Sequence, residues 1–146
     1  MSEAPIPADA NMSWLRASGN AAGAVVCFSG HVRDDVPDDP LISLELQHYP
    51  GMTERSLASI VAEASERWTL QSVCVDHRVG CMPPGELIVQ VAVATAHRQA
   101  AFEACAFLMD WLKVAAPFWK REVRRSGASW VTARQSDAQA RDRWLT

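Results

Sequence analysis

The chain has 146 residues, of which 49% are hydrophobic and 21% charged, and its formal net charge is −3. This balance is typical of one globular domain, and it excludes a second independent domain and a protein whose bulk charge drives binding to nucleic acid or to a membrane surface. No apolar run reaches the roughly 20 residues of a membrane-spanning helix, so we expect no membrane span. Because the net charge is slightly negative, we also expect no nucleic-acid partner.

The N-terminus and the cysteines indicate a cytoplasmic protein. The first nine residues contain acidic residues and two prolines, where a signal peptide would carry positive charge and then an apolar stretch. The cysteines are far apart and form no CxxC pair, which argues against a zinc site and against a disulfide framework. We therefore expect no metal and no cofactor, and we expect reduced, mostly buried thiols at Cys27, Cys74, Cys81 and Cys105.

The first third of the chain predicts an arm and two strands. Residues 1–22 are dominated by Pro, Ala, Ser, Asn and Gly, which predicts a poorly ordered arm without a functional role and with one turn around Trp14 and Leu15. Residues 23–32 predict a buried strand that carries His31 and Arg33 to its end. A solvated acidic loop follows, and the alternation over 43–48 predicts a half-buried strand.

The middle of the chain predicts two helices separated by a pair of strands. Apolar spacing over 53–68 predicts an amphipathic helix with Thr53 as its N-cap residue. The β-branched runs 72–79 and 87–95 predict antiparallel neighbours joined by a turn over 80–86. A second helix is predicted over 98–115, with Phe102 in its apolar stripe, and Pro117 ends it so that Lys113 lies in its last turn.

The end of the chain predicts a hairpin and a short tail. Residues 118–123 and 129–134 flank a Ser-Gly turn signal, so we expect two paired strands with Lys120 and Glu122 on one face. Residues 137–146 predict one more helical turn. Two main helices among about six strands predict an α+β domain over 23–136 with a mixed or antiparallel sheet.

Lysine is used in only one segment of this chain. Twelve of the 14 basic residues are arginine, and the two lysines, Lys113 and Lys120, are seven positions apart. A guanidinium stays protonated, whereas an ammonium can lose its proton when it is desolvated or placed beside another cation, and then acts as a nucleophile or base. The pattern therefore favours a chemical role for both lysines, against the alternative that their spacing is chance.

Further basic residues are predicted at the ends of strands and helices. His97 and Arg98 open the second helix, where backbone N–H groups bind anions. The alternative is that His97 only caps the helix and that Arg98 is an ordinary solvated residue of its first turn. Trp119 is predicted to shape a pocket for a flat ring, whereas Trp68 and Trp111 are predicted to pack in helices. An anionic substrate would suit a pocket formed by His31, Arg33, His97, Arg98, Lys113, Lys120 and Arg121.

Several segments together resemble the large, catalytic subunit of molybdopterin synthase. The resemblance covers most of the chain beyond residue 22, in the order found in that family, and the paired AHR and LK…PFWKRE motifs are specific to it. The matching segments are GAVVCFSGHVRD (23–34), LELQHYPGMTERSL (44–57), HRVGCMPPGE (77–86), AHRQAAFEACAFLMDWLKVAAPFWKRE (96–122) and SWVTARQSD (129–137).

The resemblance implies an α/β hammerhead-like fold and a homodimer at the centre of a heterotetramer, with a small ubiquitin-like sulfur carrier bound at each end. The carrier's C-terminal Gly-Gly, as a thiocarboxylate, would donate sulfur to cyclic pyranopterin monophosphate and build the dithiolene of molybdopterin. The resemblance implies that Lys113 and Lys120 line the site where the thiocarboxylate meets the pterin. Our mechanistic hypothesis is that Lys113 is the principal catalytic amine, acting as nucleophile or general base, and that Lys120 orients and neutralises. The resemblance also implies substrate binding by His31, Val32, Arg33, His97, Arg98, Lys113, Lys120, Arg121 and Glu122.

Two other functions are compatible with the same residues. The chain could be a non-catalytic docking module for a ubiquitin-like carrier, in which case its lysines would tolerate replacement. It could also be a Schiff-base lyase acting on a phosphorylated carbonyl compound, since such an enzyme uses a lysine of low pKa in a cationic pocket.

Overall fold

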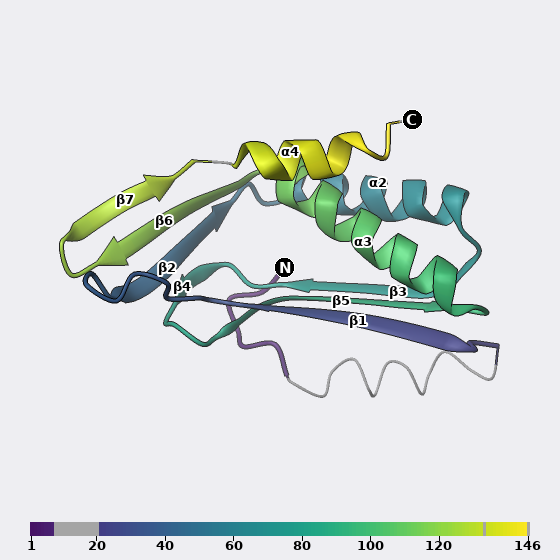
Figure 1. The fold of residues 1–146 in the computed structure, drawn as a ribbon, viewed down its shortest axis with the longest axis horizontal. Coiled ribbons are helices and arrows are strands. Elements are labelled where there is room, and N and C mark those ends of the chain that lie inside the picture. Colours follow the sequence, from purple (N-terminus) through teal and green to yellow (C-terminus); the bar gives the residue numbers. More distant parts are fainter. Residues whose placement is uncertain (8–20, 133, 146) are drawn as a thin grey trace.

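The computed structural model describes residues 1–7, 21–132 and 134–145. These residues form two antiparallel sheets and three helices (Figure 1). The strands are β1 (Ala24–His31), β2 (Leu41–His48), β3 (Leu70–His77), β4 (Gly80–Met82), β5 (Leu87–Thr95), β6 (Phe118–Arg124) and β7 (Gly127–Val131), and the helices are α2 (Met52–Arg67), α3 (Arg98–Ala115) and α4 (Gln135–Asp142).

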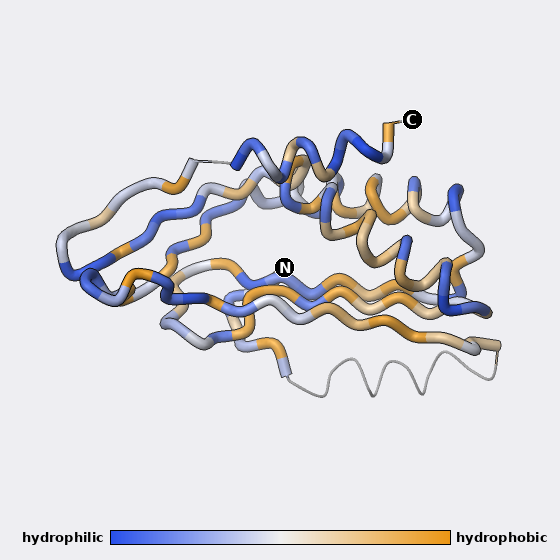
Figure 2. Tube along the Cα trace, in the orientation of Figure 1, coloured by the Kyte–Doolittle hydropathy of each residue, from blue (hydrophilic) through white to orange (hydrophobic). Residues whose placement is uncertain are grey.

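The first sheet has the order β1-β5-β3 and is covered on one face by α2 and α3 (Figure 1). The central strand β5 is almost completely buried, and its alternate residues Val89, Val91 and Val93 face the helices. These valines pack against Phe107 and Leu108 of α3, and Figure 2 shows the hydrophobic residues concentrated along this interface. The resulting core fixes the position of α3 over the sheet.

The second sheet has the order β4-β2-β6-β7 and projects beyond the first. Leu44 and Leu46 of β2 pack with Val79 and Met82 in a smaller core. The register pairs Leu46 of β2 with Lys120 of β6. The inner face of this sheet therefore carries both core leucines and a lysine, and it meets the first sheet at the C-terminal end of α3.

The α+β class, the antiparallel pairing and the main elements are confirmed. The predicted strands 72–79 and 87–95 pair as antiparallel neighbours, and the helix over 98–115 has the predicted bounds. The division into two sheets was not predicted. Residues 80–86 were predicted as a turn only, but residues 80–82 form the edge strand β4 against β2.

Two helix predictions are corrected. Thr53 is not the N-cap residue of its helix, because α2 begins one residue earlier and is capped by Gly51, whose φ of 81° suits glycine. Thr53 is instead buried in the first turn, where its hydroxyl donates to the carbonyl of Tyr49. Phe102 of α3 is 63% exposed, because the buried stripe of the helix runs through Ala101, Ala104, Cys105, Leu108 and Leu112.

The tail is longer and better anchored than one helical turn. Helix α4 begins at Gln135, before the predicted boundary at 137, and packs on α3 (Figure 1). The indole N–H of Trp144 donates to the carboxylate of Asp110 at 2.8 Å, and its ring contacts Trp68 edge-on. Trp68 and Trp111 pack in the helical layer as predicted.

The N-terminal arm was predicted to be poorly ordered, but part of it is paired. Ser2 forms an isolated parallel bridge with Arg78, and its backbone N–H donates to the carbonyl of His77 at 3.0 Å. The predicted turn around Trp14 and Leu15 lies outside the described residues.

The acidic loop after β1 was predicted to be solvated, but three of its carboxylates are engaged, and Asp35 pairs with Arg33 and Arg124. Asp34 accepts a hydrogen bond from the backbone of Leu41, and Asp39 accepts from the backbone and hydroxyl of Ser126. Asp34 and Asp39 also lie against Arg124, which is bonded to the Asp34 carboxylate and the Asp39 carbonyl. The loop is therefore tied to the turn between β6 and β7.

Candidate functional site

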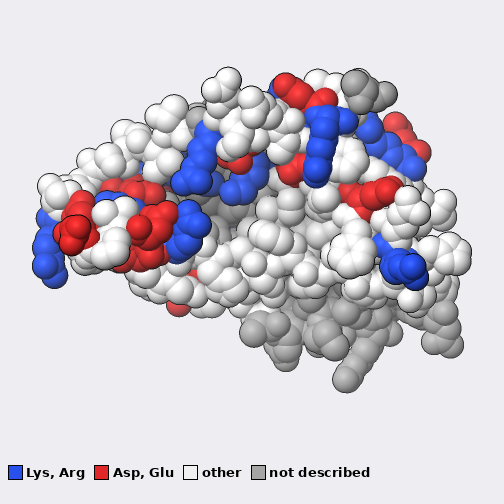
Figure 3. All heavy atoms as spheres, viewed as in Figure 1, with Lys and Arg blue, Asp and Glu red and all other residues white. Residues whose placement is uncertain are grey.

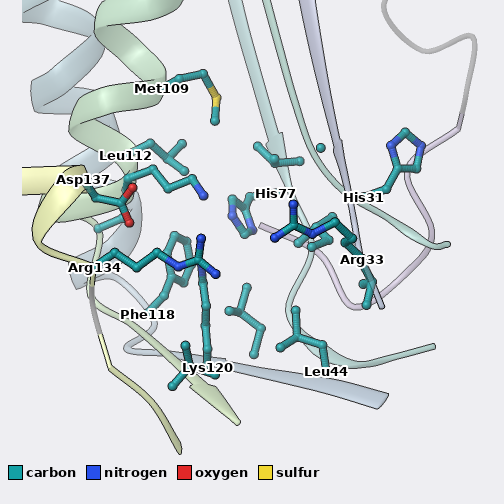
Figure 4. A pocket seen from close by; sticks show the side chains of 18 of the residues that line it. His31, Arg33, Leu44, His77, Met109, Leu112, Phe118, Lys120, Arg134 and Asp137 are labelled. Carbon is teal, nitrogen blue, oxygen red and sulfur yellow. The ribbon is translucent and has the colours of Figure 1, made fainter. Parts of the chain in front are cut away.

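A cavity of about 530 Å³ lies where the two sheets meet the C-terminal end of α3. Its lining comes from β1, β2, β3, β5, α3, β6 and β7 and from the segment that leads into α4 (Figure 4). Leu44, Leu46 and Phe118 supply apolar wall, and four basic side chains, Arg33, Lys113, Lys120 and Arg134, also line it. A concave site with apolar walls and a few polar groups is the usual form of a small-molecule site.

Both lysines of the chain line this cavity. Lys113 lies in the last turn of α3, and Lys120 lies on the inner face of β6. Burial lowers the pKa of Lys120 from its ordinary value, and the positive charge of Lys113 lowers it further. The sequence prediction that the lysines share a site is consistent with this arrangement.

Arg134 and Asp137 flank Lys120 and were not predicted as site residues. The Asp137 carboxylate raises the pKa of Lys120, whereas the Arg134 guanidinium lowers it. Both belong to the segment at the start of α4, and Figure 4 shows them on the side of the cavity opposite Arg33. Arg134 falls at the end of the predicted strand 129–134 and Asp137 at the start of the predicted tail, and neither has a sequence signal beyond its charge.

His77 is a further cavity residue that the sequence analysis did not single out. It is the last residue of β3, only 5% exposed, and its ring stacks on Phe118 at 4.3 Å with an interplanar angle of 21°. Burial lowers the pKa of His77 to about 4, and the hydrogen bond to the Arg78 carbonyl opposes this. The imidazole is therefore neutral at physiological pH.

The loop after β1 brings its predicted residues to the cavity. His31, Val32 and Arg33 all line it. Val32 is 4% exposed, and its backbone N–H donates to the Glu86 carbonyl at 2.8 Å. Arg33 is exposed and forms an ion pair with Asp35 at 2.8 Å.

Glu122 also lines the cavity, as predicted from the alternation of β6. Its carboxylate pairs with Arg124 at 2.8 Å, and only 12% of the Arg124 side chain is exposed. Arg124 thereby joins a cavity residue to the acidic loop described above.

Arg121 and Trp119 lie on the other face of β6. The Arg121 guanidinium forms an ion pair with Glu45 at 3.3 Å, on the face of the sheet away from Lys120. Trp119 is 51% exposed and does not line the cavity. The prediction that Trp119 shapes the pocket is wrong, because neighbouring residues of a strand point to opposite faces.

His97 and Arg98 lie at a second, separate hollow. His97 occupies the N-cap position of α3 without a side-chain capping bond, and it lines this hollow with Arg98 and Phe102. Within this chain the structure thus groups His31, Val32, Arg33, Lys113, Lys120 and Glu122, and it does not group His97, Arg98 or Arg121 with them.

Charged side chains are unevenly distributed over the visible face. Figure 3 shows basic side chains around the recess beside the second sheet, and a mixed acidic and basic cluster at the tip of that sheet. The tip is where Arg124 meets Asp34 and Asp35. The recess is accordingly the part of this face that suits an anion.

The cysteines do not supply a nucleophile to the cavity. Burial raises the pKa values of Cys74 and Cys105 to about 11, so both thiols are protonated at neutral pH. None of the four cysteines forms a disulfide, but the prediction that most are buried is wrong, since Cys27 and Cys81 are exposed and Cys74 is partly exposed. In the described part of the chain, no three His, Cys, Asp or Glu residues group as metal ligands.

None of the helices in the described part of the chain has the length and apolar character to cross a bilayer.

Comparison with known proteins gives one consistent result. The family model described as MoaE protein matches residues 1–115. The molybdopterin synthase catalytic subunit of Vibrio cholerae is 54% identical over 128 residues, which cover 88% of this chain and 85% of that relative.

Solved structures give the same family and fold. The molybdopterin biosynthesis MoaE protein of Burkholderia ambifaria has a TM-score of 0.83 at 43% identity, and the match covers 99% of this chain and 95% of that one. A chain from the complex of subunits 1 and 2 of the Helicobacter pylori molybdopterin-converting factor has a TM-score of 0.71 at 18% identity, covering 86% and 82%, which shows a shared fold.

Proposed function

The chain belongs to the MoaE family of molybdopterin synthase catalytic subunits, and we propose that it transfers sulfur to cyclic pyranopterin monophosphate. The sulfur would come from the C-terminal thiocarboxylate of a small ubiquitin-like carrier subunit, and the product would be the dithiolene of molybdopterin. We place this reaction in the cytoplasm.

One observation carries the proposal: the only two lysines of the chain line one cavity, where burial and the charge of Lys113 lower the pKa of Lys120. A thiocarboxylate tail and a cyclic phosphate are both anions, so a cavity lined by amines and guanidiniums favours both. An amine whose charged form is destabilised gives up its proton more readily, as acyl-transfer chemistry requires.

The pKa direction suggests how the two lysines divide the work. In our proposal Lys120 supplies the neutral amine, which acts as base or nucleophile at the carrier's acyl group. Lys113, whose positive charge lowers the pKa of Lys120, binds and neutralises an anionic group of the substrate or tail. This assignment exchanges the roles that we hypothesised from the sequence, and it rests on the desolvation of Lys120.

The remaining residues are proposed as binding groups. Arg33 is exposed at the edge of the cavity and has the donor geometry to hold a phosphate. Glu122 contributes a carboxylate to the lining of the same cavity, and His31 and Val32 are also part of that lining.

We propose that His97 and Arg98 bind substrate in the cavity of a second copy of the chain. They line a hollow of their own, so they serve the cavity only if a homodimer brings them to the partner protomer's lysines. Arg121 faces the opposite side of β6, and we assign it no contact with substrate.

The direct test is reconstitution. The purified chain is mixed with a thiocarboxylated carrier subunit and cyclic pyranopterin monophosphate, and dithiolene product is measured after oxidation to its fluorescent derivative. Product formation supports the proposal. A stable complex by size-exclusion chromatography without any product would overturn it in favour of a docking module, and a borohydride-reduced substrate adduct would favour a Schiff-base lyase.

A further inference from the structure

His77 occupies a defined place in the wall of the cavity. Its ring lies parallel to that of Phe118, and Phe118 precedes Lys120 by two residues on β6, so both side chains leave the strand on the same face. Figure 4 shows Lys120, Phe118 and His77 around the same part of the cavity. The positive charge of the half-buried Lys120 lowers the pKa of His77, although no hydrogen bond joins the two side chains in this structure.

The tautomer of His77 follows from its backbone partner. Its Nδ1 lies 2.7 Å from the carbonyl oxygen of Arg78, and a carbonyl can only accept a hydrogen bond. Nδ1 therefore carries the proton, which leaves the lone pair on Nε2.

The backbone at Arg78 is itself fixed. The Arg78 N–H donates to the Ile88 carbonyl at 2.7 Å, and the buried Arg78 guanidinium pairs with Glu86 at 2.5 Å. The His77 ring is therefore held by its stack on Phe118 and by its hydrogen bond to the Arg78 carbonyl. These two contacts fix the orientation of the ring and so the direction of the Nε2 lone pair.

His77 adds a neutral acceptor to a cavity that also contains the hydroxyls of Thr132 and Ser136. The basic side chains around it can only donate hydrogen bonds, whereas the neutral imidazole accepts at Nε2 without adding charge. The titratable groups whose charge acts on His77 are Lys120, the amino terminus of Met1 and His48, and those that act on Lys120 are Lys113, Asp137 and Arg134.

We propose that His77 is a positioning residue for Lys120, whose flexible side chain can turn to donate a hydrogen bond from its amine to Nε2 of the imidazole. When the amine is neutral, this bond turns its lone pair away from the ring and into the cavity. The effect on rate rests on the proposed function, but the hydrogen bond itself does not.

The ring nitrogens can be tested separately by two amides. In His77→Asn the side-chain N–H can still donate to Arg78, but nothing replaces Nε2. In His77→Gln the longer amide brings an acceptor to the position of Nε2. We expect His77→Asn to lower kcat about tenfold with little change in KM, and His77→Gln to stay within about threefold of the wild type, as the loss and retention of one hydrogen bond to a charged group imply.

The decisive measurement is a titration of the lysines by NMR, because the chain contains only two. Lysine labelled with ¹³C at Cε gives two signals, assigned by Lys113→Arg. We expect the Lys120 titration to move to lower pH in His77→Asn and His77→Phe and to return toward the wild type in His77→Gln, because the acceptor stabilises the ammonium.

Two outcomes overturn the inference. One is a Lys120 titration that is the same in the wild type, His77→Asn and His77→Phe at unchanged melting temperature. The other is a loss of kcat that follows the loss of melting temperature across all three variants, which is the result of a purely structural role. If the wild type makes no product but the Lys120 titration still responds to His77, the proposed function fails and the positioning contact stands.

Discussion

The positive charge of Lys113 lowers the pKa of Lys120, although the first lies in the last turn of α3 and the second in β6. The helix ends at Ala115, two residues after Lys113, and residues 116 and 117 connect it to β6, with Pro117 preventing its continuation. The short connection brings two cations of similar chemistry to one cavity. Their protonation is therefore linked, and replacing one changes the other.

The linkage predicts different results for two replacements of Lys113. We expect Lys113→Ala to abolish dithiolene product, because it removes both the anion-binding group and the charge that lowers the pKa of Lys120. Lys113→Arg retains the charge, so it should keep measurable activity, reduced by about ten- to a hundredfold through altered geometry. Single-turnover product formation with thiocarboxylated carrier is the measurement.

The same pair of replacements at Lys120 provides the comparison. A guanidinium cannot supply a neutral amine, so Lys120→Arg should be as inactive as Lys120→Ala. Wild-type activity in Lys120→Arg would show that the neutral amine is not at this position. Carrier binding by size-exclusion chromatography must persist in all four variants for the comparison to report on chemistry.

The ion pairs of Arg124 predict that replacing this residue weakens both substrate binding and stability. Its guanidinium joins Glu122 in the cavity to Asp34 and the Asp39 carbonyl in the loop beyond Arg33. In Arg124→Gln the cavity carboxylate loses its partner and the loop loses its anchor. We expect KM for the pterin to rise and the free energy of unfolding to fall by about 1–3 kcal/mol.

The neighbouring Arg125 provides a matched control. Its side chain is exposed, and its backbone N–H, which donates to Pro40, survives substitution. Arg125→Gln should leave KM unchanged and shift the free energy of unfolding by less than about 0.5 kcal/mol. Equal effects of the two substitutions in urea denaturation would mean that the ion pairs of Arg124 contribute nothing specific.

The site residues that could be predicted from the sequence are those whose placement follows from a local pattern within one strand or helix. Strand alternation is a local property, so it was enough to put Lys120 and Glu122 on one face of β6. The same rule excludes Trp119 from that face, and the prediction that Trp119 shapes the pocket failed because adjacency in sequence was taken as adjacency in space.

Residues that reach the cavity by tertiary contact were beyond such patterns. His77 enters the site through its stack on Phe118, 41 positions along the chain, and Arg134 and Asp137 enter through the packing of α4 on α3. Neither contact has a periodic signature. The division of the strands into two sheets likewise depends on which edges pair, because β2 pairs with β6 and β4 instead of with β1.

His77 also predicts how stability depends on pH. Its pKa is about 4 in the folded protein and near 6.5 when unperturbed, so between these values the unfolded chain binds a proton that the folded chain does not. Stability is therefore lost as pH falls from about 6.5 to 4, by up to about 3 kcal/mol for this group. Urea denaturation at a series of pH values measures it.

Substitution isolates the contribution of His77. In His77→Phe the stack can persist without titration, so the loss of stability between pH 6.5 and 4 should become shallower by about that amount. His97→Gln, at an exposed histidine, should retain the full wild-type slope. A wild-type slope in His77→Phe would assign the acid sensitivity to other groups.

The separation of His97 and Arg98 from the lysines predicts complementation between copies. If these residues serve the cavity of a partner protomer, then Arg98→Ala and Lys113→Ala affect different protomers of each composite site. A dimer formed from one chain of each variant contains one site with both defects and one site with neither. Mixing the two inactive variants should therefore restore about half of the wild-type activity per dimer of mixed composition.

The control is a dimer in which one chain carries both substitutions and the other chain is wild type. A chain carrying both Arg98→Ala and Lys113→Ala, paired with a wild-type chain, leaves one defect in each site, so such a dimer should be inactive. If Arg98 acted within its own chain, the pattern would reverse: the mixed single variants would stay inactive and the double variant paired with wild type would retain one intact site. Differently tagged chains, purified through both tags and assayed for dithiolene product, distinguish these results, because only the arrangement of defects differs between the two dimers.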